Sequence, residues 1–307
     1  MKVYSSIEEF QNVERPTVTT GTFDGVHFGH RKIIDRLKKA AQNCDGETVV
    51  LTFSSHPRMV LFPDDQDLKL LNTIEEKKYL LEKAGVQHLI VHPFTKEFSR
   101  ISSINYVRDI LVNKLKTHKL VIGYNHHFGR NREGSFEHLQ EFSSIYGFDV
   151  EEIPVQLLDN VGVSSTKIRK ALFQGDVETA AEYLGYQYQI TGTVVKGNAI
   201  GRTIEFPTAN IELGNVKKII PADGVYAVWV TFEGATYRGM MNIGKKPTLM
   251  NQARTLEVHL LEFEQDIYYK EIKIQFVKRI RNEIAFQEVR ELKEQLEKDL
   301  VFVSTIL

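Results

Sequence analysis

The sequence predicts two domains: an α/β domain built on a mostly parallel sheet, followed by an antiparallel β domain that ends in a helix. In the first half of the 307 residues, short β-branched runs alternate with amphipathic helical patterns, which is typical of a parallel sheet covered by helices. In the second half, strand-like runs follow one another at hairpin spacing, which is typical of an antiparallel barrel or sandwich. The pattern changes near Tyr186, so we expect one domain over residues 1–185 and another over residues 186–307.

The helices and strands of the first half follow in chain order. Apolar residues recur at helical spacing after His30, and further helices are expected at "SINYVRDILVNKL" and at "TIEEKKYLLEKAG", which ends on the capping residue Gly85. Two short helices, broken at Gly175, are expected in "SSTKIRKALFQGDVETAAEYLGY". The expected strands are "PTVTTGTF", "TVVLTF", "HLIVHPF", "HKLVIGY" and "FDVEEIPV".

The second half is expected to consist of strands and one terminal helix. The closing stretch "QEVRELKEQLEKDL" places Val289, Leu292, Leu296 and Leu300 on one helical stripe. The expected strands are "YQITGTVV", "GVYAVWVTF", "ATYRGMMNIG", "TLEVHLLEF" and "EIKIQFVKRI".

Composition excludes several functional classes. The net charge is −1, so no overall basic field favours nucleic acid or an anionic membrane as a partner. The single cysteine, Cys44, excludes an internal disulfide and a multi-cysteine zinc site, and fits a reducing compartment. No apolar run approaches the ~20 residues of a membrane helix, and the beginning of the chain does not resemble a signal peptide. We therefore expect a soluble cytoplasmic protein. Its oligomeric state, including self-association, is left open.

The string "GTFDGVHFGH", residues 21–30, joins an expected strand to an expected helix. Ligands in open α/β sheets bind at the carboxyl ends of strands, and the N-terminus of a helix favours phosphate. Glycines at 21, 25 and 29 allow close backbone approach, and His27 and His30 could donate hydrogen bonds to a phosphate. Two other interpretations are incidental loop histidines and a metal-binding pair, although no third ligand stands at an obvious spacing.

A second string, "VSSTKIR" at residues 163–169, is expected to open a helix. The hydroxyls of Ser164, Ser165 and Thr166 can cap it, and Arg169 follows one turn later, where a guanidinium could bind phosphate. A plain helix cap with a solvated arginine is the alternative. The two strings together resemble the GxFDxxHxGH and ISSTxxR signatures of nucleotidyltransferases, whose histidines bind the nucleotide triphosphate.

Two further strings narrow the resemblance. "LTFSSHP" and "GYNHHFGRNREGS" are similar to segments of the adenylyltransferase domain of bacterial bifunctional riboflavin kinase/FAD synthetases. For His56, a turn residue before proline is the alternative. The resemblance implies a flavin site that includes His56, Pro57, Asn125, Phe128, Gly129 and Arg130. It implies a nucleotide site that includes Gly21, Phe23, Asp24, Gly25, His27, Gly29, His30, Ser164, Ser165, Thr166 and Arg169.

The second half contains "KGNAIGRTIEFPTANI", residues 196–211. Gly197 and Gly201 bracket a loop that could bend around a phosphate chain. On an extended segment Thr208 and Asn210 would share a face, and two oxygen ligands on one face suit Mg²⁺ with bound nucleotide phosphates. On its own "PTAN" is a turn-like tetrapeptide. In riboflavin kinases this motif binds the metal and phosphates, and the resemblance adds Arg202 to the phosphate loop.

Phosphorylation of an alcohol also requires a group that takes the hydroxyl proton. The resemblance assigns this role to Glu257 in "EVH"; alternatively, this glutamate lies on the polar face of a strand. Asn242 in "MMNIGKKPT" and Arg279 in "VKRIR" are the remaining expected flavin or nucleotide contacts. The family often has glycine where Glu205 stands, and an acidic side chain there would weaken ATP binding or reset the loop.

The resemblance implies a Rossmann-like nucleotidyltransferase domain followed by a kinase β-barrel with a terminal helix. It implies two reactions: phosphorylation of riboflavin by ATP to FMN, and adenylylation of FMN by a second ATP to FAD with release of pyrophosphate. The expected ligands are riboflavin, FMN, FAD and ATP, with Mg²⁺ as the metal. Three alternatives stay open: a nucleotidyltransferase for another substrate, a flavin-binding protein without turnover, and a chain with one active and one decayed site.

Overall fold

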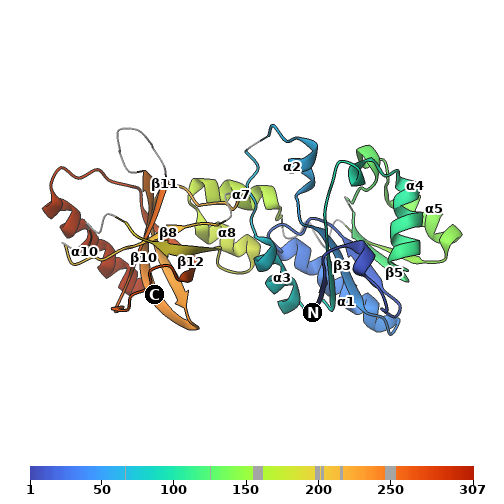
Figure 1. Ribbon diagram of the computed structural model, residues 1–307, viewed down its shortest axis with the longest axis horizontal. Helices are drawn as coiled ribbons and strands as arrows, with labels where there is room; N and C mark the ends of the chain where they lie inside the picture. The colour runs from blue at the N-terminus through green and yellow to red at the C-terminus, as the bar shows by residue number, and fades with distance from the viewer. Residues whose placement is uncertain are drawn as a thin grey trace. The chain divides into compact units, whose positions relative to one another are not determined.

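The computed structural model describes residues 1–65, 67–124, 126–154, 162–197, 201, 204–214, 217–245 and 254–307. The expected site residues Asn125 and Arg202 lie outside these ranges. The chain divides into two compact units, Met1–Ser165 and Thr166–Leu307 (Figure 1). The sequence pattern had placed the domain boundary at residue 186, after two helices that pack with the second unit.

The first unit contains a six-stranded sheet in the order β1-β4-β3-β2-β5-β6, and every pair in it is parallel. This confirms the predicted parallel sheet. The sequence pattern missed β1, because three residues at a sheet edge are too few to show a period. The strands are β1 (Lys2–Tyr4), β2 (Thr17–Thr20), β3 (Thr48–Phe53), β4 (His88–His92), β5 (Lys119–Gly123) and β6 (Asp149–Ile153).

Three helical stretches of this unit, Phe28–Asn43, Ile74–Lys83 and residues 103–114, lie where apolar periodicity predicted them, whereas the helices Pro57–Leu61 and Phe136–Tyr146 were not predicted. A capping box between Thr73 and Glu76 starts α3. The helix expected at "SINYVRDILVNKL" is α4 continuing into the π-helical segment η3. The helical segments are η1 (Ile7–Glu9), α1 (Phe28–Asn43), α2 (Pro57–Leu61), α3 (Ile74–Lys83), η2 (Phe98–Arg100), α4 (Ser103–Asn105), η3 (Tyr106–Lys114), η4 (Arg130–Arg132) and α5 (Phe136–Tyr146).

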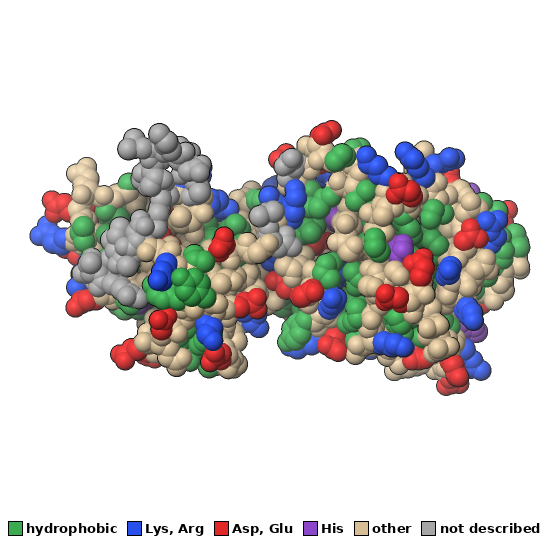
Figure 2. All heavy atoms as spheres, in the orientation of Figure 1, with side chains coloured by type: hydrophobic (Ala, Val, Ile, Leu, Met, Phe, Trp, Pro, Cys, Tyr) green, Lys and Arg blue, Asp and Glu red, His purple; other side chains and the backbone are tan. Residues whose placement is uncertain are grey.

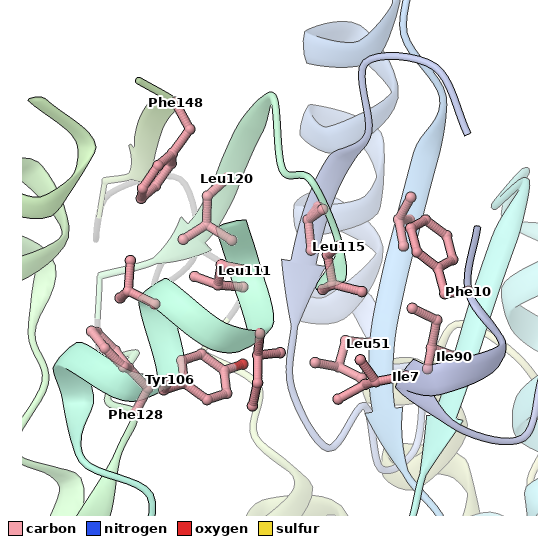
Figure 3. Packing of buried hydrophobic residues seen from close by; sticks show 14 of the residues in the cluster. Ile7, Phe10, Leu51, Ile90, Tyr106, Leu111, Leu115, Leu120, Phe128 and Phe148 are labelled. Carbon is pink, nitrogen blue, oxygen red and sulfur yellow. The ribbon is translucent and has the colours of Figure 1, made fainter. Parts of the chain in front are cut away.

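The core of the first unit forms between the sheet and η3. Figure 3 shows Leu111 of η3 and Leu115, which directly follows η3, among side chains of the strands, with Tyr106 and Phe128 side by side at one end. The rings of Tyr106 and Phe128 have centroids 5.5 Å apart. The hydroxyl of Tyr106 donates a hydrogen bond of 3.2 Å to Thr20 Oγ1 at the end of β2. This packing fixes the carboxyl end of β2, where the glycine- and histidine-rich turn begins.

The second unit begins with two helices and continues as a closed antiparallel barrel of order β10-β11-β8-β7-β12-β9. The closed barrel decides between the two predicted architectures, barrel and sandwich. Lys278 of β12 forms an ion pair of 3.0 Å with Glu178 of α8. The elements are α7 (Ser165–Gln174), α8 (Val177–Leu184), β7 (Gln189–Val195), β8 (Ala209–Glu212), β9 (Gly224–Phe232), β10 (Ala235–Lys245), β11 (Arg254–Leu260), β12 (Glu271–Arg281) and α10 (Val289–Ile306).

The terminal helix α10 packs on the barrel, as Figure 1 shows. Three members of the predicted stripe, Leu292, Leu296 and Leu300, join a buried cluster with Phe206 of the loop before β8. The fourth, Val289, is 60% exposed, because it stands in the first turn, beyond the contact with the barrel. The buried part of the predicted stripe therefore begins at Leu292.

In the part of the chain that the structure describes, no helix is long and apolar enough to span a membrane. Acidic and basic side chains are interspersed over the face shown in Figure 2, which agrees with the net charge of −1.

Candidate active sites

The turn that follows β2 occupies the expected place for a ligand in a parallel sheet. Strand β2 lies between β3 and β5, so the strand order changes direction beside it. Residues 21–27 connect β2 to α1, whose N-cap residue is His27. The first N–H groups of a helix have no acceptor within the helix, so such a position favours anions.

His27 and His30 form a stacked pair of imidazoles. Their ring centroids lie 3.7 Å apart with an interplanar angle of 15°. Nδ1 of His27 accepts the backbone N–H of His30 at 3.4 Å, so in the neutral ring the proton is on Nε2. Burial, and then the neighbouring His27 and Lys77, hold the pKa of His30 well below its usual value. His30 Nδ1 is buried and has no hydrogen-bond partner among the described residues.

The other side chains of this turn hold its shape. Asp24 is 3% exposed, and its carboxylate accepts the backbone N–H of Leu71 at 3.0 Å and that of Asn72 at 3.3 Å. Phe23 is buried, has a φ of 46°, and packs on the ring of His30 at 5.1 Å. Gly25 has a φ of 93°, which favours glycine. The structure therefore places Phe23 and Asp24 as supports of the turn; their predicted contact with a nucleotide stays a prediction.

The "VSSTKIR" string begins α7 as expected. The hydroxyl of Ser165 donates a hydrogen bond of 2.8 Å to the backbone carbonyl of Asp24. The structure thus brings Ser165 to the turn that carries the histidines. Ser164 is exposed just before the helix, while Thr166 and Arg169 lie in α7, across the division between the units. Phosphate binding by these three residues stays a prediction.

The expected flavin residues of the first unit have visible structural roles. His56 is the N-cap of α2, where Nδ1 accepts the N–H of Arg58 at 3.2 Å, and Pro57 follows in the first helical turn. Phe128 is 6% exposed and belongs to the core. At Gly129, with a φ of 73°, a Cβ would lie 2.7 Å from the backbone N of Ser103. Arg130, in contrast, is exposed, and flavin binding by this set stays a prediction.

In the barrel, three predicted residues lie side by side on neighbouring strands. Glu257 of β11 pairs in register with Asn242 of β10 on one side and with Asn210 of β8 on the other. Residues directly opposite in antiparallel strands point to the same face of the sheet. Thr208, two residues before Asn210, donates from Oγ1 to Glu257 Oε2 at 3.3 Å. The structure therefore brings together one carboxylate, two carboxamides and one hydroxyl.

The glycines of the loop before β8 are required by close approach. A Cβ at Gly197 would lie 2.0 Å from Asn210 Nδ2, and one at Gly201 would lie 2.2 Å from the carbonyl oxygen of Phe206. Either side chain would displace the segment that carries Thr208 and Asn210. The predicted loop glycines thus fix the position of the polar row.

Two cavities border this row. One, of about 290 Å³, is lined on one side by Thr208, Asn210, Asn242 and Glu257 and on the other by apolar residues of the loop and α10. The second, of about 470 Å³, is lined by Pro207, Thr208, Phe263 and the segment 264–268. Thr208 is the residue of the polar row that borders both cavities.

Sequence reasoning missed several residues of the smaller cavity. His259 Nδ1 lies 2.8 Å from the carbonyl oxygen of Pro207, which can only accept, so the ring donates. Arg281 lines the cavity, whereas the predicted Arg279 does not. The Arg279 guanidinium binds the backbone carbonyls of Gln174 at 3.2 Å and Asp223 at 2.5 Å. The strand period would have found His259, two residues after Glu257 on the same face.

Glu205 has an unusual backbone conformation and an ion-pair partner. Its φ is 68°, the left-handed region that favours glycine, and its carboxylate pairs with Lys293 of α10 at 2.5 Å. The neighbouring ammonium lowers the pKa of this carboxyl. The loop thus keeps the backbone conformation in which the family often has glycine.

Hard oxygen atoms of Thr208, Asn210 and Glu257 make a donor set that suits Mg²⁺. By contrast, no cluster of three or more His, Cys, Asp or Glu side chains that could hold a metal occurs within the described ranges.

Two family models match the chain, FAD synthetase at residues 9–167 and riboflavin kinase at residues 184–307. A bifunctional riboflavin kinase/FMN adenylyltransferase from Haemophilus influenzae is 40% identical over 92% of this chain and 91% of its own length. Its counterpart from Listeria monocytogenes is 37% identical over 95% of this chain and 92% of its own length. A crystal structure described as a macrolide-efflux protein from Streptococcus pneumoniae is 31% identical, covers 98% of both chains and has a TM-score of 0.89.

Proposed function

Because the chain belongs to the family of bifunctional riboflavin kinase/FMN adenylyltransferases, it is an enzyme of flavin cofactor biosynthesis, and we propose how its residues divide the work. The polar row of the barrel phosphorylates riboflavin to FMN. The turn after β2 adenylylates FMN to FAD. The functional domains are residues 1–185 and 186–307, and the reactions take place in the cytoplasm.

In the kinase step, riboflavin occupies the smaller cavity and ATP the larger one. The apolar lining by Phe206, Met240 and Leu296 suits an aromatic ring system. Thr208, which borders both cavities, marks the place where the γ-phosphoryl group passes. The primary hydroxyl of the ribityl chain attacks the γ-phosphorus, its proton goes to the Glu257 carboxylate, and ADP leaves.

Thr208 and Asn210 would hold Mg²⁺ with the nucleotide phosphates. A bound Mg²⁺ supplies charge neutralisation for the phosphate oxygens. Asn242, opposite Glu257 on β10, would orient either the carboxylate or the hydroxyl that it deprotonates. Gly197 and Gly201 let the loop backbone approach the phosphates.

In the adenylyl step, the nucleophile is the FMN phosphate, which is already an anion because its second pKa is about 6. It attacks the α-phosphorus of ATP and pyrophosphate leaves, so no general base is required. The site has to orient two anions and stabilise the added charge. His27, His30 and the N-terminus of α1 supply hydrogen-bond donors, and Ser165 anchors the turn.

The observation that carries the proposal is the polar row Asn242–Glu257–Asn210 beside Thr208. Its test is a time course with purified protein, riboflavin, ATP and MgCl₂, with the flavins separated by chromatography. FMN should appear first and FAD second. FMN alone would remove the adenylyl role from the first unit. If the protein makes FAD from supplied FMN but does not convert riboflavin, the kinase site of the barrel is inactive, and Glu205 is the first residue to replace. If neither riboflavin nor FMN is converted, the proposal is wrong and the alternative of a flavin-binding protein without turnover is favoured.

A further inference from the structure

A buried ammonium group lies beneath the turn that carries the histidines. Lys77 of α3 is 7% exposed, and its Nζ donates to the carbonyl of Thr22 at 2.7 Å and to Thr52 Oγ1 at 3.4 Å. Burying a charge is costly unless the charge is hydrogen-bonded. The next residue, Lys78, shows the ordinary alternative, because its side chain is 36% exposed and pairs with Glu75.

The carbonyl that Lys77 binds belongs to a strained part of the chain. The Thr22 carbonyl also accepts a hydrogen bond of 3.1 Å from Thr52 Oγ1 at the end of β3. Phe23 follows with a φ of 46°, and Val26 has a φ of 38°. L-residues avoid this region, so such a turn persists only where surrounding contacts hold it. His27 comes directly after the second strained residue.

The charge of Lys77 also acts on the site. It is one of the causes that hold the pKa of His30 low, after burial and His27. The titratable groups facing Lys77 are therefore Asp24 of the turn and His30 of α1. Burial lowers the pKa of Lys77 to about 8, although the Asp24 carboxylate opposes that shift.

We propose that Lys77 is a positioning residue for adenylyl transfer, whose ammonium holds the Thr22 carbonyl and thereby the turn that presents His27 to the triphosphate. The inference rests on the proposed adenylylation site of the first unit. Lys77 touches neither substrate, and it acts through the backbone between β2 and α1.

The first test compares Lys77→Met and Lys77→Arg with the control Lys78→Met on the same helix. FAD formation from FMN and ATP should fall about tenfold to a hundredfold in Lys77→Met, the loss expected for one charge-assisted hydrogen bond. Lys77→Arg, which keeps the charge, should lose less. Lys78→Met should stay within about twofold of wild type, and phosphorylation of riboflavin by the same preparations should be unchanged.

The second test uses pH and does not depend on a folded Lys77→Met variant. Wild-type FAD formation should fall as pH rises through about 8, while Lys77→Arg stays flat, because arginine remains charged. Between about pH 8 and 10 the unfolded chain binds the lysine proton that the folded chain has lost, so ΔG of unfolding should rise with pH from this group. Activity and the stability contributed by Lys77 therefore change in opposite directions.

Each outcome decides the inference. Three results would each overturn the positioning role while leaving the two reactions in place. Lys77→Met could form FAD at the wild-type rate, FAD formation by Lys77→Arg could fall above pH 8 as it does in wild type, or activity and stability could fall together as pH rises. A wild-type protein that makes FMN but converts no FMN to FAD would overturn the proposed adenylylation site, and the role of Lys77 with it.

Discussion

Removal of the Asp299 carboxylate should destabilise the second unit by about 3 kcal/mol. Asp299 of α10 is 2% exposed and forms an ion pair with Arg281 of β12, with Nη2 and Oδ2 2.7 Å apart. Gln295 donates to the same carboxylate at 2.8 Å. Breaking a buried pair costs roughly 3–5 kcal/mol, because it leaves an unpaired charge. We expect the lower end, because Arg281 also donates to the Asn282 carbonyl at 3.0 Å and borders a cavity.

The assay can report the second unit alone. The chain has one tryptophan, Trp229, and it lies in β9 of the barrel. Urea unfolding followed by tryptophan fluorescence should therefore show an earlier midpoint for Asp299→Ala. The matched control is Lys293→Ala, which removes an exposed ion pair from the same helix and should cost no more than about 1 kcal/mol.

A double variant separates charge from packing. Replacing both partners, as Arg281→Met with Asp299→Leu, should restore most of the lost stability, since an apolar pair of similar volume is often neutral. Riboflavin KM should be raised in the double variant, because Arg281 lines the proposed flavin cavity. The reasoning is refuted if Asp299→Ala loses less than about 1 kcal/mol, or if it matches Lys293→Ala.

Three further predictions address the two sites. His30→Ala should reduce FAD formation at least about tenfold and spare FMN formation, and Glu257→Ala should do the reverse; loss of both activities in one folded variant would contradict two independent sites. Glu205→Gly should be more stable than Glu205→Ala by about 1 kcal/mol in the Trp229 assay, because only glycine adopts the observed φ of 68° without strain, and equal midpoints would contradict this. ATP binding near pH 6 should take up a proton, because the triphosphate raises the pKa of His30 from the low value that burial imposes. Calorimetry in buffers of different ionisation enthalpy measures this uptake, which should be absent in His30→Asn.

The sequence predicted the elements best where one period ran for several residues. Strand β9 coincides with the expected "GVYAVWVTF", and β3 with "TVVLTF", because each is a β-branched and aromatic run with clear ends. The first three residues after Met1 formed a strand without any such signal. Its pairing with β4 is a tertiary effect that local propensity does not contain.

The residues of the polar row in the barrel were predictable from the sequence, whereas the role of Lys77 and the position of Arg279 were not. Thr208, Asn210 and Glu257 were named through the family resemblance, since each alone has an ordinary structural explanation. The register pairing of Asn210 with Glu257, and the hydrogen bond from Thr208 to Glu257, required the fold. Lys77 could not be found, because a lysine in a helix of alternating charges resembles a solvated surface residue. Arg279 was named, and the structure places its guanidinium on backbone carbonyls instead of the cavity.

The difference between the two sites follows from the charge of the two nucleophiles. In the barrel, Glu257 stands among amide and hydroxyl groups on the wall of a cavity, and in the proposed kinase step it accepts the proton of a neutral alcohol. In the turn of residues 21–30 the one carboxylate, Asp24, accepts backbone N–H groups of residues 71 and 72. In the proposed adenylylation site this turn supplies hydrogen-bond donors, and a free acid there would repel both the FMN phosphate and the triphosphate. Asp24→Asn should therefore act mainly on folding of the turn, lowering stability and FAD formation together, whereas His30→Ala should lower FAD formation with little loss of stability.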